Sequence, residues 1–156
     1  MKLLEIIVKD AVIPELAAST RDDAVAELID ALVAAGRVDA SDREDFVKAV
    51  ILREDKGSTG FGHGVAVPHV KHSSVTTMSV AVGNSGDGID FKSLDRQPVH
   101  SIMLLLSPED KPEDHLDAME AIFGNLSQDT FRRFLRQATS PDDVITLLVE
   151  ADAAAR

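Results

Sequence analysis

The sequence predicts a single α/β domain in which helices cover a sheet. Its 156 residues are the length of one domain. Hydrophobic residues make up 44% of the chain and charged residues 28%, which are the ordinary proportions of a globular protein with a core. Apolar residues at helical spacing open and close the chain, and strand-like runs lie between them, as expected of a layered α/β fold.

Two helices are predicted in the first third of the chain. Ser19 and Thr20 form an N-cap before apolar residues at helical spacing, which predicts a helix over about 20–35. The run Ser41–Glu44 has the form of a capping box and opens a second helix that ends near Arg53.

Strands are predicted in the middle of the chain. Val65–Val67 reads as a short strand closed by Pro68, because proline cannot continue the ladder of a central strand. Residues 75–82 alternate weakly, and the turn-forming residues 83–88, "GNSGDG", follow them. The nearly continuous apolar run 99–106 is typical of a strand covered on both faces.

Helical patterns close the chain. They lie at about 112–126, 128–137 and 141–150. The last of them begins with an N-cap at Ser140 and a proline at the first helical position. The predicted domain therefore spans residues 1–150, and residues 151–156, "ADAAAR", are expected to form a disordered tail.

The composition of the chain argues against several classes of function. The formal charge of −11 is spread along the chain without a basic stripe, which argues against nucleic acid and suits basic protein partners. The absence of cysteine excludes disulfides, thiolate metal sites and a cysteine nucleophile. No signal-peptide pattern and no apolar run of about 20 residues is present, so we expect a cytoplasmic protein without membrane insertion. We expect no cofactor.

The stretch 53–72, "REDKGSTGFGHGVAVPHVKH", is unusually rich in glycine. A Walker loop would need Lys and Ser/Thr after its last glycine, but His63 and Gly64 follow Gly62. A dinucleotide fingerprint should follow a strand and open a helix, whereas this segment follows a helix and precedes a strand. Both templates fail, and a tight loop that needs positive φ angles remains one interpretation.

His69 favours a functional interpretation of this stretch. Proline restricts the preceding residue to extended geometry and fixes its own φ near −65°. Val67 and Pro68 are therefore expected to hold His69 rigidly at the end of a strand, where the chain turns away.

The other histidines have less specific surroundings. His63, His69 and His72 do not have a spacing that puts three imidazoles on one face, so no metal site is predicted. His72 is interpreted as a solvated residue next to a lysine, and His100 as a structural histidine in an apolar strand.

His115 and Arg53 each allow two interpretations. His115 lies in the first turn of a predicted helix, where it is either an exposed residue or a neighbour of a bound phosphate, because helix N-termini favour anions. Arg53 either satisfies the last carbonyls of its own helix or returns to the glycine segment as a bidentate phosphate clamp.

The pattern R-E-x-x-x-S-T-G-x-G-x-G-x-A-x-P-H from Arg53 to His69 resembles enzyme IIA of the fructose/mannitol/nitrogen-regulatory class of the bacterial phosphotransferase system. The resemblance extends along the chain, from "LLEIIVKDAVI" to "TSPDDVITLL". It implies a mixed sheet of about five strands with helices on both faces. Two positions depart from the family pattern: His63 stands where some sugar-specific members have an acidic residue, and Val70 stands where Gly or Ala is more usual.

The resemblance implies a phosphocarrier. His69 would accept a phosphoryl group, through Nε2, from a histidine-phosphorylated carrier protein of the HPr or NPr type, with Arg53 and His115 as supporting residues. The loop residues that would support the phosphoryl group are Ser58, Thr59, Gly60, Gly62, His63 and Gly64. A neutral imidazole suits this chemistry because it is nucleophilic near neutral pH.

Three functions remain open at this point. A nitrogen-type regulatory protein, whose phosphorylation state controls protein partners, is favoured because the chain carries no IIB or IIC domain. The first alternative is a fructose- or mannitol-specific component that donates to a cysteine of enzyme IIB. The second is a protein-binding module that is not phosphorylated.

Overall fold

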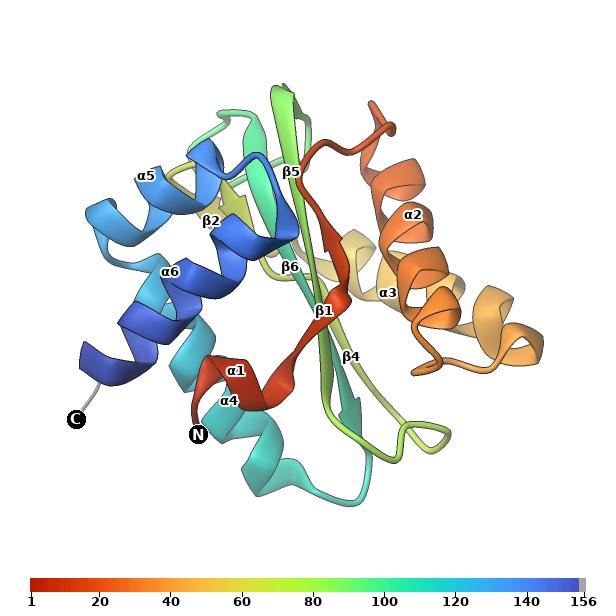
Figure 1. Cartoon of the computed structure of the whole chain (residues 1–156). Helices are drawn as coiled ribbons and strands as arrows, with labels where there is room; N and C mark the ends of the chain where they lie inside the picture. The colour runs from red at the N-terminus through yellow and green to blue at the C-terminus, as the bar shows by residue number, and fades with distance from the viewer. Residues whose placement is uncertain (155–156) are drawn as a thin grey trace.

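The computed structural model describes residues 1–154, which form a six-stranded mixed sheet with helices on both faces (Figure 1). The strand order is β1-β5-β6-β3-β2, and β4 also pairs with β6. The strands are β1 (Ile7–Ile13), β2 (Gly60–Gly62), β3 (Val65–Ala66), β4 (His69–His72), β5 (Ser79–Ile89) and β6 (Val99–Pro108). The predicted α/β class is confirmed, with six strands where about five were expected.

Helices cover the two faces unequally. They are α1 (Leu3–Ile6), α2 (Arg21–Ala34), η1 (Ala40–Asp42, a 3₁₀ turn), α3 (Arg43–Lys56), α4 (Pro112–Leu126), α5 (Asp129–Gln137) and α6 (Pro141–Ala154). Figure 1 shows α2 and α3 on one side of the sheet and α1, α4, α5 and α6 on the other. Each side has its own hydrophobic core, because the strands are buried on both faces.

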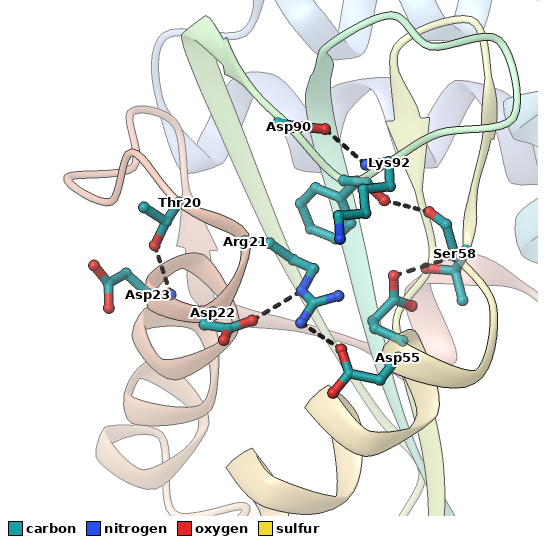
Figure 2. Close-up of polar contacts among 11 residues, drawn as sticks. Thr20, Arg21, Asp22, Asp23, Asp55, Ser58, Asp90 and Lys92 are labelled. Carbon is teal, nitrogen blue, oxygen red and sulfur yellow. Dashed lines mark hydrogen bonds and ion pairs between the residues drawn. The ribbon is translucent and has the colours of Figure 1, made fainter.

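Most of the predicted helix starts follow from local chemistry. The capping box expected at Ser41–Glu44 does not form, since Ser41 lies in η1 and α3 begins at Arg43 without a side-chain cap. The side chain of Thr20 accepts a hydrogen bond from the Asp23 amide at 3.2 Å and caps α2 (Figure 2). Pro112 and Pro141 are the first helical residues of α4 and α6, as expected of proline.

The central strand β6 organises the site. It pairs antiparallel with β5 on one side and parallel with β3 and β4 on the other. Val65 of β3 lies opposite Ser101, and His69 of β4 lies opposite Leu105, so one register continues through both short strands. The prediction that the chain turns away after Pro68 is wrong, because this proline interrupts the ladder and the chain continues along β6.

The segment 83–88 is not a turn. It belongs to β5, where the pairing with β6 shifts register between Asn84 and Ile89. The glycines that predicted a turn instead form an irregular stretch of strand, in which Gly88 has a φ of 85°.

The expected tail is also corrected for residues 151–154, which continue α6. The side chain of Asp152 is only 6% exposed, and its carboxylate accepts hydrogen bonds from the amides of Leu3 and Leu4 at 2.9 and 3.0 Å. This contact holds the last turn of α6 against α1. Residues 155–156 of the predicted tail lie outside the described residues. Within residues 1–154, no helix combines the length and apolar character that a bilayer span requires.

Candidate functional site

His69 is the first residue of β4 and is half-buried. Side chains alternate between the two faces of a strand. Val70 packs against the core beneath α2 and α3, and the His72 ring lies 4.5 Å from the Phe46 ring of α3. His69 and Lys71 therefore point to the opposite face, which α4 covers.

A backbone carbonyl determines the tautomer of His69. Its Nδ1 lies 2.8 Å from the carbonyl oxygen of Val67. Because a carbonyl only accepts hydrogen bonds, Nδ1 carries the proton and donates. In the neutral ring, Nε2 is then the nitrogen with the free lone pair, which makes it the nucleophilic atom.

The surroundings of His69 favour its neutral form. Partial burial has the largest effect and lowers its pKa below the usual 6.5. The hydrogen bond to Val67 opposes this shift, whereas the positive charge of Arg53 lowers the pKa further. His69 is therefore uncharged at neutral pH and available as a nucleophile.

His115 of α4 faces His69. Their ring centroids are 5.7 Å apart, and the side chain of His115 is buried, with 6% exposed. Burial, followed by the proximity of His69, lowers the pKa of His115. The interpretation of His115 as an exposed first-turn residue is wrong, because α4 turns this residue onto β6.

Ser107 was missed by the sequence analysis. Its hydroxyl lies 2.6 Å from Nδ1 of His115, and the residue is fully buried near the end of β6. The bond occupies Nδ1, so Nε2 is the ring nitrogen of His115 that remains for other partners. The available signal was a hydroxyl directly after a run of leucines, five positions before Pro112, where the predicted helix begins.

Arg53 lies in the last turn of α3 and is half-buried. Its Nη1 donates to the carbonyl oxygen of Gly57 at 2.8 Å. The interpretation that Arg53 satisfies a carbonyl at the helix end is therefore correct. The same charge lies near enough to lower the pKa of His69, so Arg53 also belongs to the electrostatic surroundings of the imidazole.

The loop after α3 is held against the sheet by Ser58. Its hydroxyl donates to the Phe91 carbonyl at 2.6 Å and accepts from the Gly60 amide at 3.0 Å. Figure 2 shows this contact near Arg21, whose guanidinium binds Asp55 of α3 at 2.8 Å. The end of α3 and the loop that follows are thus fixed by contacts from two other parts of the chain.

Glu54 is the second residue that sequence reasoning did not assign. Its carboxylate is buried, and Oε1 accepts from the Thr59 amide at 3.2 Å. The Thr59 carbonyl in turn accepts from the Val67 amide at 3.4 Å. Hydrogen bonds therefore connect Glu54 through Thr59 to Val67, whose carbonyl orients His69. Among the described residues, Glu54 Oε2 and Thr59 Oγ1 are buried without a hydrogen-bond partner.

The glycine segment divides into two parts. Ser58, Thr59 and Gly60 lie at the end nearest Val67, whereas Gly62 ends β2 and His63 and Gly64 form the turn to β3. That turn contacts the start of β6, since the Gly64 carbonyl accepts from the amides of His100 and Ser101 at 2.8 and 3.1 Å.

This second part lies away from His69. The paired positions Ser101 and Leu105 are four residues apart on β6, or about 13 Å along a strand. The expectation that Gly62, His63 and Gly64 support a phosphoryl group on His69 is therefore corrected by their position. Left-handed φ angles of 110°, 60° and 76° explain why two of these three residues are glycine.

Two other histidines have structural contacts. His100 Nδ1 donates to the Ser85 carbonyl at 2.9 Å, as a structural histidine should. His72 is not simply solvated, because its ring packs on Phe46 and its Nδ1 accepts from the Ser74 amide at 3.0 Å.

The chain is similar in sequence and fold to several known proteins. Residues 5–151 match the family model described as "Phosphoenolpyruvate-dependent sugar phosphotransferase system, EIIA 2". A fructose-specific EIIA component from Haloferax volcanii is 36% identical over 132 residues, with 85% of this chain and 84% of that protein covered. The chain spans only 24% of the fructose-specific EIIABC component of Bacillus subtilis, to which it is 32% identical.

Regulatory proteins are similar as well. The nitrogen regulatory protein of Bradyrhizobium diazoefficiens is 30% identical over 155 residues, which cover 99% of both chains. The crystal structure of nitrogen regulatory protein IIA-Ntr from Neisseria meningitidis superposes with a TM-score of 0.83 at 27% identity, covering 92% of this chain and 97% of that one.

Proposed function

Because the chain belongs to the EIIA 2 family of the phosphoenolpyruvate-dependent sugar phosphotransferase system, we propose that it is a phosphocarrier whose acceptor atom is Nε2 of His69. The observation that carries the proposal is the hydrogen bond from Nδ1 to the Val67 carbonyl, which leaves Nε2 free. The donor is a histidine-phosphorylated carrier protein of the HPr or NPr type.

The transfer conserves charge and protons. The P–N bond of the donor breaks as the bond from phosphorus to Nε2 of His69 forms, and the donor ring leaves as a neutral imidazole. The proton on Nδ1 stays in place. Val67 accepts the bond from that proton, so its carbonyl stabilises the positive charge that the phosphorylated ring acquires.

Arg53 and His115 act on the phosphoryl oxygens. Phosphoryl transfer depends on positioning and on compensation of negative charge. Arg53 supplies a positive charge close to His69. His115 donates from Nε2 when the Ser107 hydroxyl donates to its Nδ1.

We favour a regulatory role, in which the phosphorylation state of the protein controls its protein partners. It is supported by the structural similarity to IIA-Ntr, with a TM-score of 0.83. The second candidate is donation to a cysteine of enzyme IIB during sugar uptake, which is supported by the 36% identity to a fructose-specific EIIA component. Phosphorylated protein mixed with IIB distinguishes them, because only a sugar-specific component loses its phosphoryl group to the IIB cysteine.

Phosphorylation in vitro tests the proposal. The protein is incubated with phosphoenolpyruvate, enzyme I and a histidine carrier, and one acid-labile, base-stable phosphoryl group is expected by mass spectrometry. ¹⁵N NMR of the labelled histidine should place it on Nε2. His69→Ala should abolish the label, whereas the matched control His63→Ala, at an exposed position, should retain it.

Two outcomes contradict the proposal. Label that persists in His69→Ala would assign the acceptor to another residue. A wild-type protein that stays unlabelled with both HPr and NPr carriers would favour the non-phosphorylated binding module.

A further inference from the structure

The start of β6 lies away from His69, which pairs with Leu105 near the other end of that strand. There the turn between β2 and β3, the start of β6 and one side of α5 enclose a pocket of about 510 Å³. Its lining includes His63, His100 and the arginines 132, 133 and 136 of α5. Because the strand positions facing the two sites are about 13 Å apart along β6, this pocket is separate from the phosphoryl site.

The pocket is positively charged on an acidic protein. The chain has a formal charge of −11, yet three arginines lie within five residues of α5. Arg132 and Arg136 are four residues apart on one helix face, a spacing at which like charges destabilise a helix. An anion bound between them would remove this repulsion.

One arginine forms an ion pair and the other two form none among residues 1–154, although the Arg133 guanidinium lies 5.6 Å from the centre of the Phe134 ring. Arg132 donates to the Leu126 carbonyl at 2.8 Å and binds Asp129 at 3.4 Å, with its side chain 14% exposed. Asp129 is the only carboxylate among the described lining residues, and Arg132 already pairs with it. Within residues 1–154, Arg133 and Arg136 have no carboxylate within 4.0 Å.

The helix that carries these arginines is anchored to the sheet. Asn84, buried in β5, donates from its side chain to the Leu135 carbonyl at 2.8 Å. Its side-chain oxygen accepts from the Ser101 hydroxyl of β6 at 2.8 Å. Because this buried network joins α5 to two strands, the helix backbone that carries the arginines is held against the start of β6 before any ligand arrives.

We propose that this pocket binds a small polyanion, a molecule with two or more phosphate or carboxylate groups. A guanidinium group can bind the oxygens of either a phosphate or a carboxylate in bidentate geometry. Apart from the imidazoles of His63 and His100, no aromatic ring is among the described lining residues, so the pocket offers no platform for stacking a nucleobase. Recognition therefore depends on the anionic groups.

Binding of two probes tests the proposal and separates the two chemistries. Inorganic pyrophosphate presents phosphate, and citrate presents carboxylate. Calorimetry should give saturable binding of at least one, and amide NMR shifts should centre on Gly64, Ser101 and Gln137. The double variant Arg133→Gln/Arg136→Gln should weaken binding about tenfold or more, because it removes the charge-assisted hydrogen bonds of both guanidinium groups to the anion.

The controls keep the test independent of phosphoryl transfer. Lys2→Gln/Lys48→Gln removes two positive charges from exposed positions elsewhere and should leave binding unchanged. The arginine double variant should still be phosphorylated on His69, so failure of one proposal does not affect the other.

Three results would overturn this inference. They are the absence of saturable binding of either probe at millimolar concentration, unchanged affinity in the arginine double variant, and NMR shifts centred on His69 and Arg53. If neither probe binds but a polyglutamate peptide shifts the same amides, the surface is instead a docking site for an acidic protein.

Discussion

The hydroxyl of Ser107 and Nδ1 of His115 are 2.6 Å apart in a buried contact between β6 and α4. This bond orients the ring that faces His69 at a centroid distance of 5.7 Å. Second partners of this kind commonly decide which nitrogen of a histidine points to the substrate.

Ser107→Ala should therefore remove the hydrogen bond that orients the His115 ring and leave the ring itself in place. We expect the ¹⁵N NMR signals of His115 to change from one tautomer to a mixture, and phosphorylation of His69 to slow by about tenfold, the usual lower range for a positioning group. Ser107→Thr should restore both properties in part. Unchanged ring signals in Ser107→Ala would show that packing alone orients His115.

Acid should destabilise the protein through its two site histidines. The folded-state pKa values of His69 and His115 both lie below 6.5. The unfolded chain therefore binds more protons between pH 6.5 and these lower values, so the free energy of unfolding falls as the pH drops through this window. Each histidine contributes a slope of at most about 1.4 kcal/mol per pH unit.

Urea denaturation between pH 7.5 and 5 measures this slope. The double variant His69→Gln/His115→Gln should have a smaller slope than the wild type over that range, since it lacks both groups. An equal slope would assign the acid sensitivity to other residues. The rate of His69 phosphorylation should stay constant from pH 8 to 6.5, because the ring is neutral throughout.

Glu54 should stabilise the loop beside His69. Glu54→Ala leaves the buried Thr59 amide without its acceptor, which should cost about 1–3 kcal/mol of unfolding free energy. Glu54→Gln keeps an acceptor oxygen and should cost less. Equal losses in the two variants, measured by urea denaturation, would indicate that the negative charge rather than the hydrogen bond is important.

Gly60 is required by a close approach rather than by its backbone angles. A Cβ atom at this position would overlap Oγ of Ser93 and lie 3.0 Å from its Cβ. Gly60→Ala should therefore destabilise the protein by about 1–3 kcal/mol, as overpacking does. Adding Ser93→Gly should recover most of this loss.

Gly57→Ala provides the matched control for Gly60. Its Cβ would meet no atom within 4 Å, and its φ of 169° is extended. Thermal denaturation should give a melting temperature near that of the wild type. A loss as large as that of Gly60→Ala would attribute the effect to the loop in general.

The longer helices were predictable because their signals are local, whereas the four-residue α1 was not predicted. Pro112 starts α4 at the predicted residue, and the N-cap of α2 is the predicted Thr20. Strands β1, β2 and β4 were not predicted, since a strand is defined by partners far away in sequence. In β1, the exposed Lys9 and Asp10 in mid-strand also obscured the apolar pattern.

The site was predictable only in part for the same reason. The motif identifies His69 and Arg53, and the positive charge of Arg53 lowers the pKa of His69. Glu54 belongs to that motif, but its role depends on a bond to the loop, and Ser107 meets His115 only because β6 and α4 pack together. The separation of Gly62–Gly64 from His69 depends on the register along β6, which no local pattern contains.

The carboxylate of Asp152 also has a consequence for the connectivity of the fold. By binding the Leu3 and Leu4 amides it brings both ends of the described chain to one place. A short linker between them, combined with new termini in an exposed loop, should give a circular permutant with the same sheet. The order in which the elements are synthesised is therefore separable from the architecture that they form.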